Sequence, residues 1–138
     1  MRQFNALVPE LYCSHFETSL KFYTQVLGFS VVYSRIDERF AFLDRQGAQL
    51  MIEQPIPGAR AWIMGDMQPP LGKGINFEIS TTDVVQLHEK CKHNQATIYL
   101  PLEEKWYAAG DNMVGNLQFI VLDPDGYMLR FAQDLGEK

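Results

Sequence analysis

The feature that most constrains the fold is an internal repeat. Residues 43–47, Leu-Asp-Arg-Gln-Gly, resemble residues 122–126, Leu-Asp-Pro-Asp-Gly. After the shared glycine, Leu50 corresponds to Leu129 and Gln54 corresponds to Gln133. A repeat on this scale indicates one structural pattern used twice. We therefore predict one domain over residues 1–138, built of two modules at about 5–54 and 74–134 and joined by a linker loop at 55–73.

Hydrophobic alternation and turn residues predict the same element order in both modules, namely strand, helix and three strands. Strands are predicted at 7–13, 30–36, 39–43, 48–53, 75–80, 98–102, 117–122 and 127–133. This pattern predicts an α+β fold in which two βαβββ modules pair into a curved mixed sheet, a half-open barrel, with the helices on its outer face.

The first helix has clear start and stop signals. Ser14 and Glu17 have the spacing of a capping box, with Ser14 as the N-cap, and Gly28 supplies the stop. An apolar stripe between them is formed by Phe16, Leu20, Tyr23 and Leu27. In the second module, Thr81 or Thr82 is expected to cap the helix.

Composition excludes several classes of partner. The chain has 12 basic and 17 acidic residues, a net charge of −5, and no cluster of Lys and Arg that would bind nucleic acid. No transmembrane helix and no signal peptide are expected, because no apolar run is long enough. Cys13 and Cys91 are expected to be reduced, as in a cytoplasmic protein.

Two interpretations of the 55–73 loop stay open. It contains several Pro and Gly residues together with Trp62 and lacks periodicity, which is typical of a functional loop. A plain linker between the two modules explains the same composition.

Alternation within the strands separates an apolar face from a second, mixed face. The apolar faces are expected to pack on the helices. The mixed faces interleave polar and apolar groups, as ligand pockets do, although one face of an antiparallel sheet often simply meets water. The ligand-binding candidates are Glu10, Tyr12, Met51, Glu53, Trp62, Asn76, Glu78, Trp106 and Arg130. Burial in a structural role would explain the two Trp residues equally well.

Two segments resemble a known family. Ser19–Phe29, SLKFYTQVLGF, is similar to the first-helix signature of the glyoxalase/bleomycin resistance/dioxygenase (vicinal oxygen chelate) superfamily. Leu122–Phe131, LDPDGYMLRF, resembles the closing hairpin of that superfamily. The resemblance implies paired βαβββ modules in a half-open barrel, which the repeat indicates independently.

Enzymes of this superfamily usually bind a divalent metal through His, Gln or Glu at four strand positions. Matched through the two signatures, these positions fall on Val8, Glu53, Asn76 and Arg130. Only Glu53 is a good metal ligand, because valine has no donor atom, an amide is a weak ligand and arginine is a permanent cation. We therefore expect no metal or other cofactor and no catalytic residue.

Without the metal ligands, the chain most resembles the bleomycin resistance branch, whose members are dimers that sequester the antibiotic in crevices between subunits. The resemblance implies a non-enzymatic homodimer that binds a cationic, aromatic, antibiotic-like molecule. Acidic side chains would attract the cation, and Trp62, Trp106 and Tyr12 would stack on its rings. Two alternatives stay open: a metal-dependent lyase, thiol transferase or dioxygenase of the same superfamily, and a dimeric domain with a protein partner.

Overall fold

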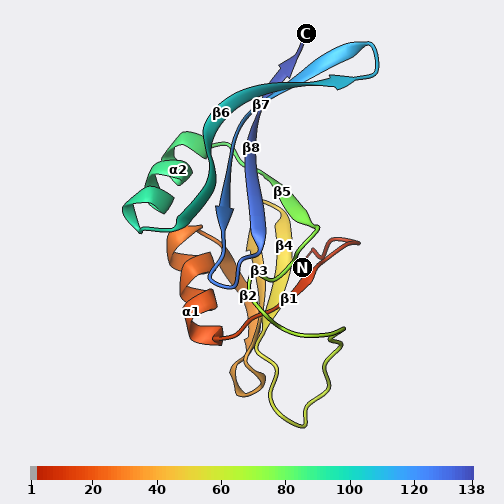
Figure 1. The fold of residues 1–138 in the computed structure, drawn as a ribbon, viewed down its shortest axis with the longest axis vertical. Coiled ribbons are helices and arrows are strands. Elements are labelled where there is room, and N and C mark those ends of the chain that lie inside the picture. Colours follow the sequence, from red (N-terminus) through yellow and green to blue (C-terminus); the bar gives the residue numbers. More distant parts are fainter. Residues whose placement is uncertain (1–2) are drawn as a thin grey trace. The chain divides into compact units, whose positions relative to one another are not determined.

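The chain forms two compact units. A computed structural model describes residues 3–138, with one unit extending to Leu71 and the other spanning Gly72–Lys138. Along the chain, the boundary between the units falls in the irregular segment that joins the two modules (Figure 1). Whether they form a single domain stays a prediction.

The first unit is a four-stranded sheet with one helix on it. Strand order is β1-β4-β3-β2, with β1 parallel to β4 and the other neighbours antiparallel. The elements are β1 (Glu10–Tyr12), α1 (Phe16–Lys21), the π-helical turn η1 (Phe22–Val26), β2 (Ser30–Arg35), the 3-10 turn η2 (Ile36–Glu38), β3 (Phe40–Arg45) and β4 (Ala48–Glu53).

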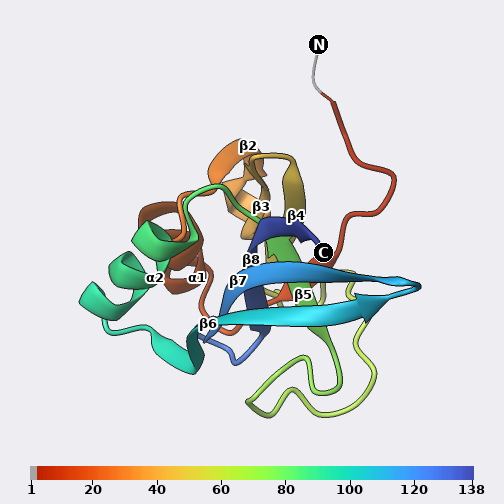
Figure 2. The same ribbon diagram turned by 90° about the horizontal axis from the view of Figure 1, so that it is seen from above.

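The second unit repeats this topology. Its strand order is β5-β8-β7-β6, with β5 parallel to β8 and the remaining pairs antiparallel. The elements are β5 (Asn76–Ser80), α2 (Val84–His93), β6 (Thr97–Ala109), β7 (Asn112–Leu122) and β8 (Met128–Glu137). Figure 2 shows the long β6–β7 hairpin extending from this sheet. The α+β class and the two βαβββ modules are therefore confirmed. No helix among residues 3–138 is long and apolar enough to cross a membrane.

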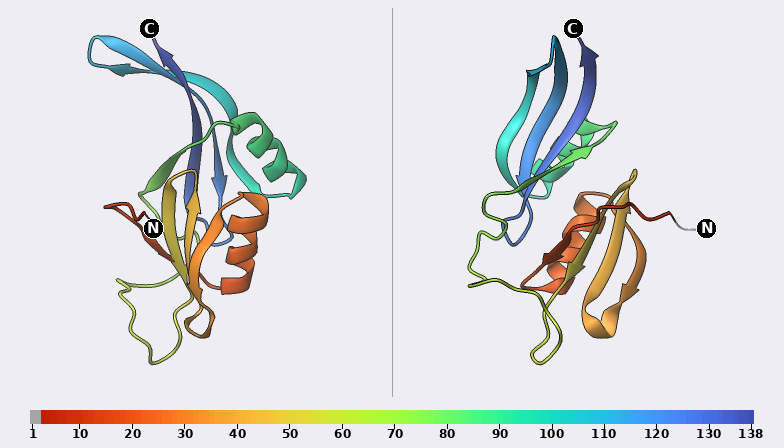
Figure 3. Two further views of the ribbon diagram at one scale, coloured as in Figure 1. Left: turned by 180° about the vertical axis from the view of Figure 1, so that it is seen from behind. Right: turned by 90° about the vertical axis from the view of Figure 1, so that its right-hand side faces the viewer.

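In each unit one helix covers one face of the sheet (Figure 3). The predicted stripe of the first helix packs there, with Phe16, Tyr23 and Leu27 almost fully buried. Leu11 and Ile52 belong to the same core. We call the opposite surface of each sheet, which does not face the helix, the far face of that unit.

The helix caps differ from those predicted. His15, not Ser14, is the N-cap residue of α1. The side chain of His15 makes no capping hydrogen bond to the start of the helix. Instead, Gln54 Oε1 accepts a hydrogen bond of 2.8 Å from the Phe16 N–H. The capping-box prediction was wrong because Gln54, which follows β4 directly, lies next to the start of α1.

The repeat extends to this cap. Gln133 Oε1 accepts a 3.2 Å hydrogen bond from the N–H of Val84, the first residue of α2. The expected threonine cap is not formed; Asp83 is the N-cap, and Thr81 Oγ1 donates to its carboxylate at 2.5 Å. In both units, the residue aligned by the repeat fills the same structural role.

Strand lengths also differ from the predictions. β1 has three residues because Pro9, which has no N–H, contributes only its carbonyl to Met51 N at 2.9 Å. β6 and β7 are much longer than predicted, because cross-strand pairing continues through the polar stretch from Glu103 to Asn116. β8 correspondingly continues to Glu137.

The turn between β7 and β8 is built around one aspartate. Asp123 is 5% exposed, and its Oδ1 accepts hydrogen bonds of 2.9 Å from the backbone N–H groups of Asp125 and Tyr127. Its side chain therefore replaces a backbone partner inside the turn. This arrangement explains the Asp-Pro-Asp-Gly sequence at this position.

We predict that Gln54→Ala and Gln133→Ala each lower the free energy of unfolding by about 1 kcal/mol, as the loss of a helix cap does. Urea denaturation measures this change. The matched Gln54→Glu and Gln133→Glu variants keep the acceptor oxygen and should retain most of the stability. Alanine variants as stable as the starting protein would contradict the capping role.

Candidate functional site

Two rows of side chains cross the far face of the first unit. In one row Glu10, Met51, Phe42 and Tyr33 lie opposite one another on neighbouring strands. In the next row Tyr12, Glu53, Phe40 and Arg35 do so. The predicted residues Glu10, Tyr12, Met51 and Glu53 therefore share one face, as strand alternation indicated.

A pocket of about 260 Å³ lies on this face. The carboxylates of Glu10, Glu38 and Glu53 line it together with the guanidinium groups of Arg35 and Arg60. Gln54 and the 55–71 segment supply the remaining wall, the segment with Pro55, Ile56, Ala59 and Trp62. The pocket thus combines acidic groups with an aromatic ring, which suits a ligand that is both positively charged and flat.

The folded protein disfavours the ionised forms of two carboxyl groups of the sheet, those of Glu10 and Glu53. Burial raises the pKa of Glu10, and the neighbouring Glu53 carboxylate raises it further, while Arg35 and a hydrogen bond with Tyr12 act in the opposite direction. Burial also raises the pKa of Glu53; Arg35 opposes this effect and Glu38 adds to it. A bound cation would relieve both carboxylates.

The arginines of the pocket are engaged with other groups. Arg35 forms an ion pair with Glu38, and its guanidinium lies 3.9 Å from the centroid of the Phe40 ring. Arg60 stacks on Trp62, with its guanidinium carbon 4.7 Å from the ring centroid. Strand alternation in β2 and β3 had not been used for the prediction, so Arg35 and Phe40 were missed.

Trp62 lies beside the predicted strand residues. Its backbone N–H donates to the Tyr12 hydroxyl at 3.1 Å, and its side chain is 68% exposed. The loop is therefore attached to the sheet at this point while the indole remains accessible. The loop contributes to the pocket, and the plain-linker interpretation does not account for this contribution.

The far face of the second unit joins three predicted residues. Arg130 Nε donates to Asn76 Oδ1 at 3.3 Å, and its terminal nitrogen lies 3.7 Å from the Glu78 carboxylate. Glu78 and Arg130 are register partners on β5 and β8. The arginine is thus held within its own sheet by two neighbouring side chains.

A buried amide on the same sheet was missed by the sequence analysis. Gln118 is 1% exposed, and its Nε2 donates to Glu103 at 3.0 Å and to the Tyr107 hydroxyl at 2.6 Å. It is the register partner of Ala132, two residues from Arg130 on β8. A glutamine inside an apolar strand such as 117–122 was the available signal.

Trp106 lies elsewhere in this unit. It sits within β6 rather than in an irregular segment, opposite Gly115, and a Cβ atom at that glycine would be 2.6 Å from the indole. Gly115 and Gln118 are three residues apart on β7, so they point to opposite faces of the strand. Trp106, the register partner of Gly115, therefore lies on the face of the hairpin opposite to Gln118. Lys138 Nζ lies 4.1 Å from its ring centroid. These contacts agree with the structural interpretation of this tryptophan.

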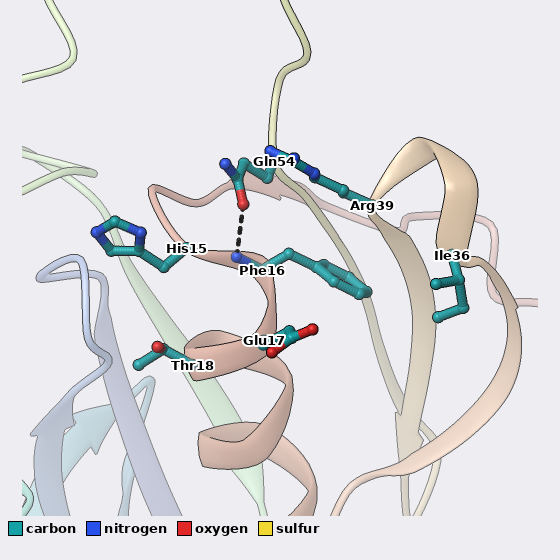
Figure 4. Close-up of a pocket in the computed structure, with 7 residues that line it drawn as sticks. All are labelled: His15, Phe16, Glu17, Thr18, Ile36, Arg39 and Gln54. Atoms are coloured by element: carbon teal, nitrogen blue, oxygen red, sulfur yellow. Dashed lines mark hydrogen bonds between the residues drawn. The ribbon is translucent and has the colours of Figure 1, made fainter.

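A second, more polar pocket of about 440 Å³ lies beside the start of α1 (Figure 4). Its lining residues are His15, Phe16, Glu17, Thr18, Ile36, Arg39 and Gln54. The amide oxygen of Gln54 already accepts a hydrogen bond from the first backbone N–H of the helix, that of Phe16. None of the predicted ligand residues lines this pocket.

The residues at the predicted metal positions do not fit a metal ion. Val8 has no donor atom, and Asn76 and Arg130 are bonded to each other. Strand register also changes one of the predicted positions. Glu10 pairs with Met51 in the first unit, as Glu78 pairs with Arg130 in the second, so the counterpart of Arg130 is Met51 and not Glu53. No group of three or more His, Cys, Asp and Glu residues within 3–138 is arranged to hold a metal.

We predict that Glu10→Gln raises the melting temperature by about 1–3 °C at pH 7. The pKa of Glu10 is raised in the folded state, so folding favours its protonated form. The associated stability is present below the ordinary pKa of 4.5 and is lost as the pH rises through the folded-state value. Thermal unfolding should therefore show a gain at pH 7 that disappears near pH 4.

The control is Asp66→Asn, which removes an exposed charge in the 55–71 segment outside the pocket. This variant should leave the melting temperature nearly unchanged at both pH values. A Glu10→Gln protein that is less stable at pH 7 would contradict the unfavourable burial of this carboxylate.

Comparison with known proteins places this fold. The model of the Glyoxalase/Bleomycin resistance protein/Dioxygenase superfamily matches residues 4–131. A comparison with curated proteins finds no match. One solved structure, a superfamily member from Vibrio splendidus 12B01, is 38% identical over 92% of this chain and 97% of its own, with a TM-score of 0.42.

Two other solved structures share the fold at lower identity. TioX from Micromonospora sp. ML1 is 20% identical, with 95% of this chain and 100% of that chain covered and a TM-score of 0.71. Lactoylglutathione lyase from Agrobacterium tumefaciens is 16% identical, with 96% of each chain covered and a TM-score of 0.61. The family match over residues 4–131, with two βαβββ units in the expected order, shows that this chain belongs to the Glyoxalase/Bleomycin resistance protein/Dioxygenase superfamily.

Proposed function

We propose that this protein is a non-enzymatic binding protein that sequesters a cationic, aromatic, antibiotic-like small molecule. The observation that carries the proposal is the pocket of the first unit, where Glu10 and Glu53 lie beside the exposed indole of Trp62. Ionised carboxylates attract a cation, and an indole binds a flat ring or a positive charge on its face. A bleomycin-type ligand combines these properties.

The charges of the pocket favour a cation over an anion. Arg35 and Glu38 form an ion pair with each other, which leaves the carboxylates of Glu10 and Glu53 and one guanidinium group, that of Arg60 on the Trp62 ring. Burial raises the pKa of Glu10 and of Glu53, so a positively charged group would gain from both. The same two carboxylates would repel an anion.

The proposal includes a homodimer with the ligand in a crevice between subunits, the arrangement that the resemblance to bleomycin resistance proteins implies. Large apolar side chains exposed on the single chain support association. Tyr99 is 63% exposed and Ile75 51% exposed. A pocket of 260 Å³ is also small for an antibiotic, so a second subunit would supply further contact area.

We predict that calorimetric titration with metal-free and copper-loaded bleomycin gives measurable heat and a rise in melting temperature. Glu53→Gln and Trp62→Ala should each weaken binding about five- to tenfold, because they remove a charge and a stacking surface. Met64→Ala is the matched control, since Met64 is fully exposed in the same loop and does not line the pocket. No heat and no thermal shift at high micromolar bleomycin would exclude this ligand.

The metal-dependent alternative is tested on the same samples. Elemental analysis of the purified protein should find no stoichiometric metal. Stoichiometric Ni, Zn, Mn or Fe that is lost in the Glu53→Gln variant would overturn the non-enzymatic proposal.

Sedimentation equilibrium tests the dimer. We expect a species of twice the chain mass of 15.9 kDa at micromolar concentration. A strictly monomeric protein, with and without bleomycin, would contradict the proposed crevice between subunits.

A further inference from the structure

The far face of the first unit carries an aromatic patch next to the acidic pocket. The patch consists of Tyr33, Phe40 and Phe42. Tyr33 and Phe42 are stacked, with centroids 5.3 Å apart and planes inclined by 17°, and Tyr33 lies 5.8 Å from Phe40. The row of Phe42 includes Glu10, and the next row includes Phe40 and Glu53. Patch and pocket therefore share these two rows: Phe40 is the register partner of Glu53 on the neighbouring strand, and Phe42 lies two strands from Glu10.

The two ends of the patch are covered by different groups. The guanidinium of Arg35 covers Phe40 at 3.9 Å. The ring of Phe4, from the segment that precedes β1, covers Phe42 edge-on, with centroids 5.2 Å apart and planes at 82°. Phe4 also meets Tyr33 edge-on at 6.4 Å. An aromatic ring from a distant part of the chain thus occupies the surface beside the pocket.

The segment that holds Phe4, residues 3–9, precedes β1, and we call it the N-terminal arm. It crosses the first unit in the right-hand view of Figure 3 before entering β1. The Asn5 N–H donates to Gln49 Oε1 at 2.8 Å, Asn5 Nδ2 donates to the Gly47 carbonyl at 2.7 Å, and Gln49 Nε2 donates to the Gln3 carbonyl at 2.8 Å. All three bonds are exposed to water, where such bonds contribute little net stability.

The large apolar side chains of the arm are largely exposed. Phe4 remains 52% exposed and Leu7 83% exposed, so neither belongs to the core. By contrast, Phe42 beneath Phe4 is 5% exposed. Phe4 makes edge-to-face ring contacts with Phe42 and Tyr33, and another ring can replace such contacts at similar free energy.

We propose that the aromatic patch is a binding subsite for a planar aromatic group of the ligand, and that Phe4 occupies it as an internal competitor which the ligand displaces. This inference rests on the proposed function, because the same ligand places its cation at Glu10 and Glu53. The chemistry of the occupant follows from Phe4 itself, since the patch already accepts a flat, uncharged ring. The ligand class is thereby narrowed to molecules that carry a cationic group and an aromatic ring about 5–10 Å apart, the separation of one to two strands in a sheet.

An internal competitor lowers the apparent affinity by the fraction of molecules in which the patch is open. Removal of the Phe4 ring should therefore strengthen binding. The probe is ethidium, a planar aromatic cation, titrated by fluorescence into the intact protein, into Phe4→Ala and into Leu7→Ala. Leu7→Ala is the matched control, because it truncates an exposed apolar residue of the same arm that makes no ring contact.

We expect Phe4→Ala to bind ethidium about three- to tenfold more tightly than the intact protein, and Leu7→Ala to bind it unchanged. Ethidium should also speed amide hydrogen exchange of the N-terminal arm in the intact protein, because displacement breaks the Asn5–Gln49 bond. Equal or weaker binding by Phe4→Ala, or an arm whose exchange is unaffected by bound ethidium, would overturn the inference.

The proposed function fails in a different way. Loss of ethidium binding in Glu53→Gln, with tighter binding in Phe4→Ala, would support both statements. Binding that Phe4→Ala does not strengthen but Glu53→Gln abolishes would remove the inference and leave the proposed function. No binding by either the intact protein or Phe4→Ala would remove both.

Discussion

The parallel pairing of the first and last strands of each module is the constraint on which the rest of the structure depends. β1 lies along β4 and β5 along β8, so the start of each helix lies beside the residue that follows the parallel-paired part of the last strand. Gln54 and Gln133, the residues that follow Glu53 and Ala132, therefore reach the first N–H of α1 and α2. Backbone bonds from Cys13 to Glu53 and from Thr81 to Ala132, both of 2.9 Å, extend the same pairing by one step.

The same pairing determines which side chains lie on the far face of each sheet. Once Leu11 and Ile52 face the helix, alternation directs Glu10, Met51 and Glu53 to the other side. In the first unit this side carries acidic groups next to aromatic rings. In the second unit it carries an arginine held by Asn76 and Glu78. The two units thus share a backbone and differ in the chemistry of their far faces.

The first unit retains groups that do not favour its own folding. The half-buried carboxylates of Glu10 and Glu53 repel each other, and a largely exposed indole extends from a loop. Groups of this kind are typical of binding sites, where stability is lost in exchange for affinity. The raised pKa of both carboxylates and the exposed Trp62 therefore point to the same region of the chain.

Much of the fold and part of the site follow from local pattern. The repeat of Leu50 and Gln54 in Leu129 and Gln133 predicts two equivalent modules, and alternation in β1 and β4 predicts which side chains share a face. Local pattern fails where the partner comes from far along the chain. The capping box at Ser14 has the right spacing, yet Gln54, 38 residues away from Phe16, makes the bond. The pairing of Trp106 with Gly115 is likewise set by strand register and cannot be read from either segment alone.

The sequence by itself determined the module order, the helix-facing stripe and the acidic character of the site, because periodicity, turn residues and charge are local properties. Only the tertiary structure decided which groups meet. Phe4 lies on Phe42, Trp62 bonds to Tyr12, and Gln54 and Gln133 cap the helices. Each of these contacts joins residues at least 38 positions apart, and strand register, which no single segment specifies, brings them together.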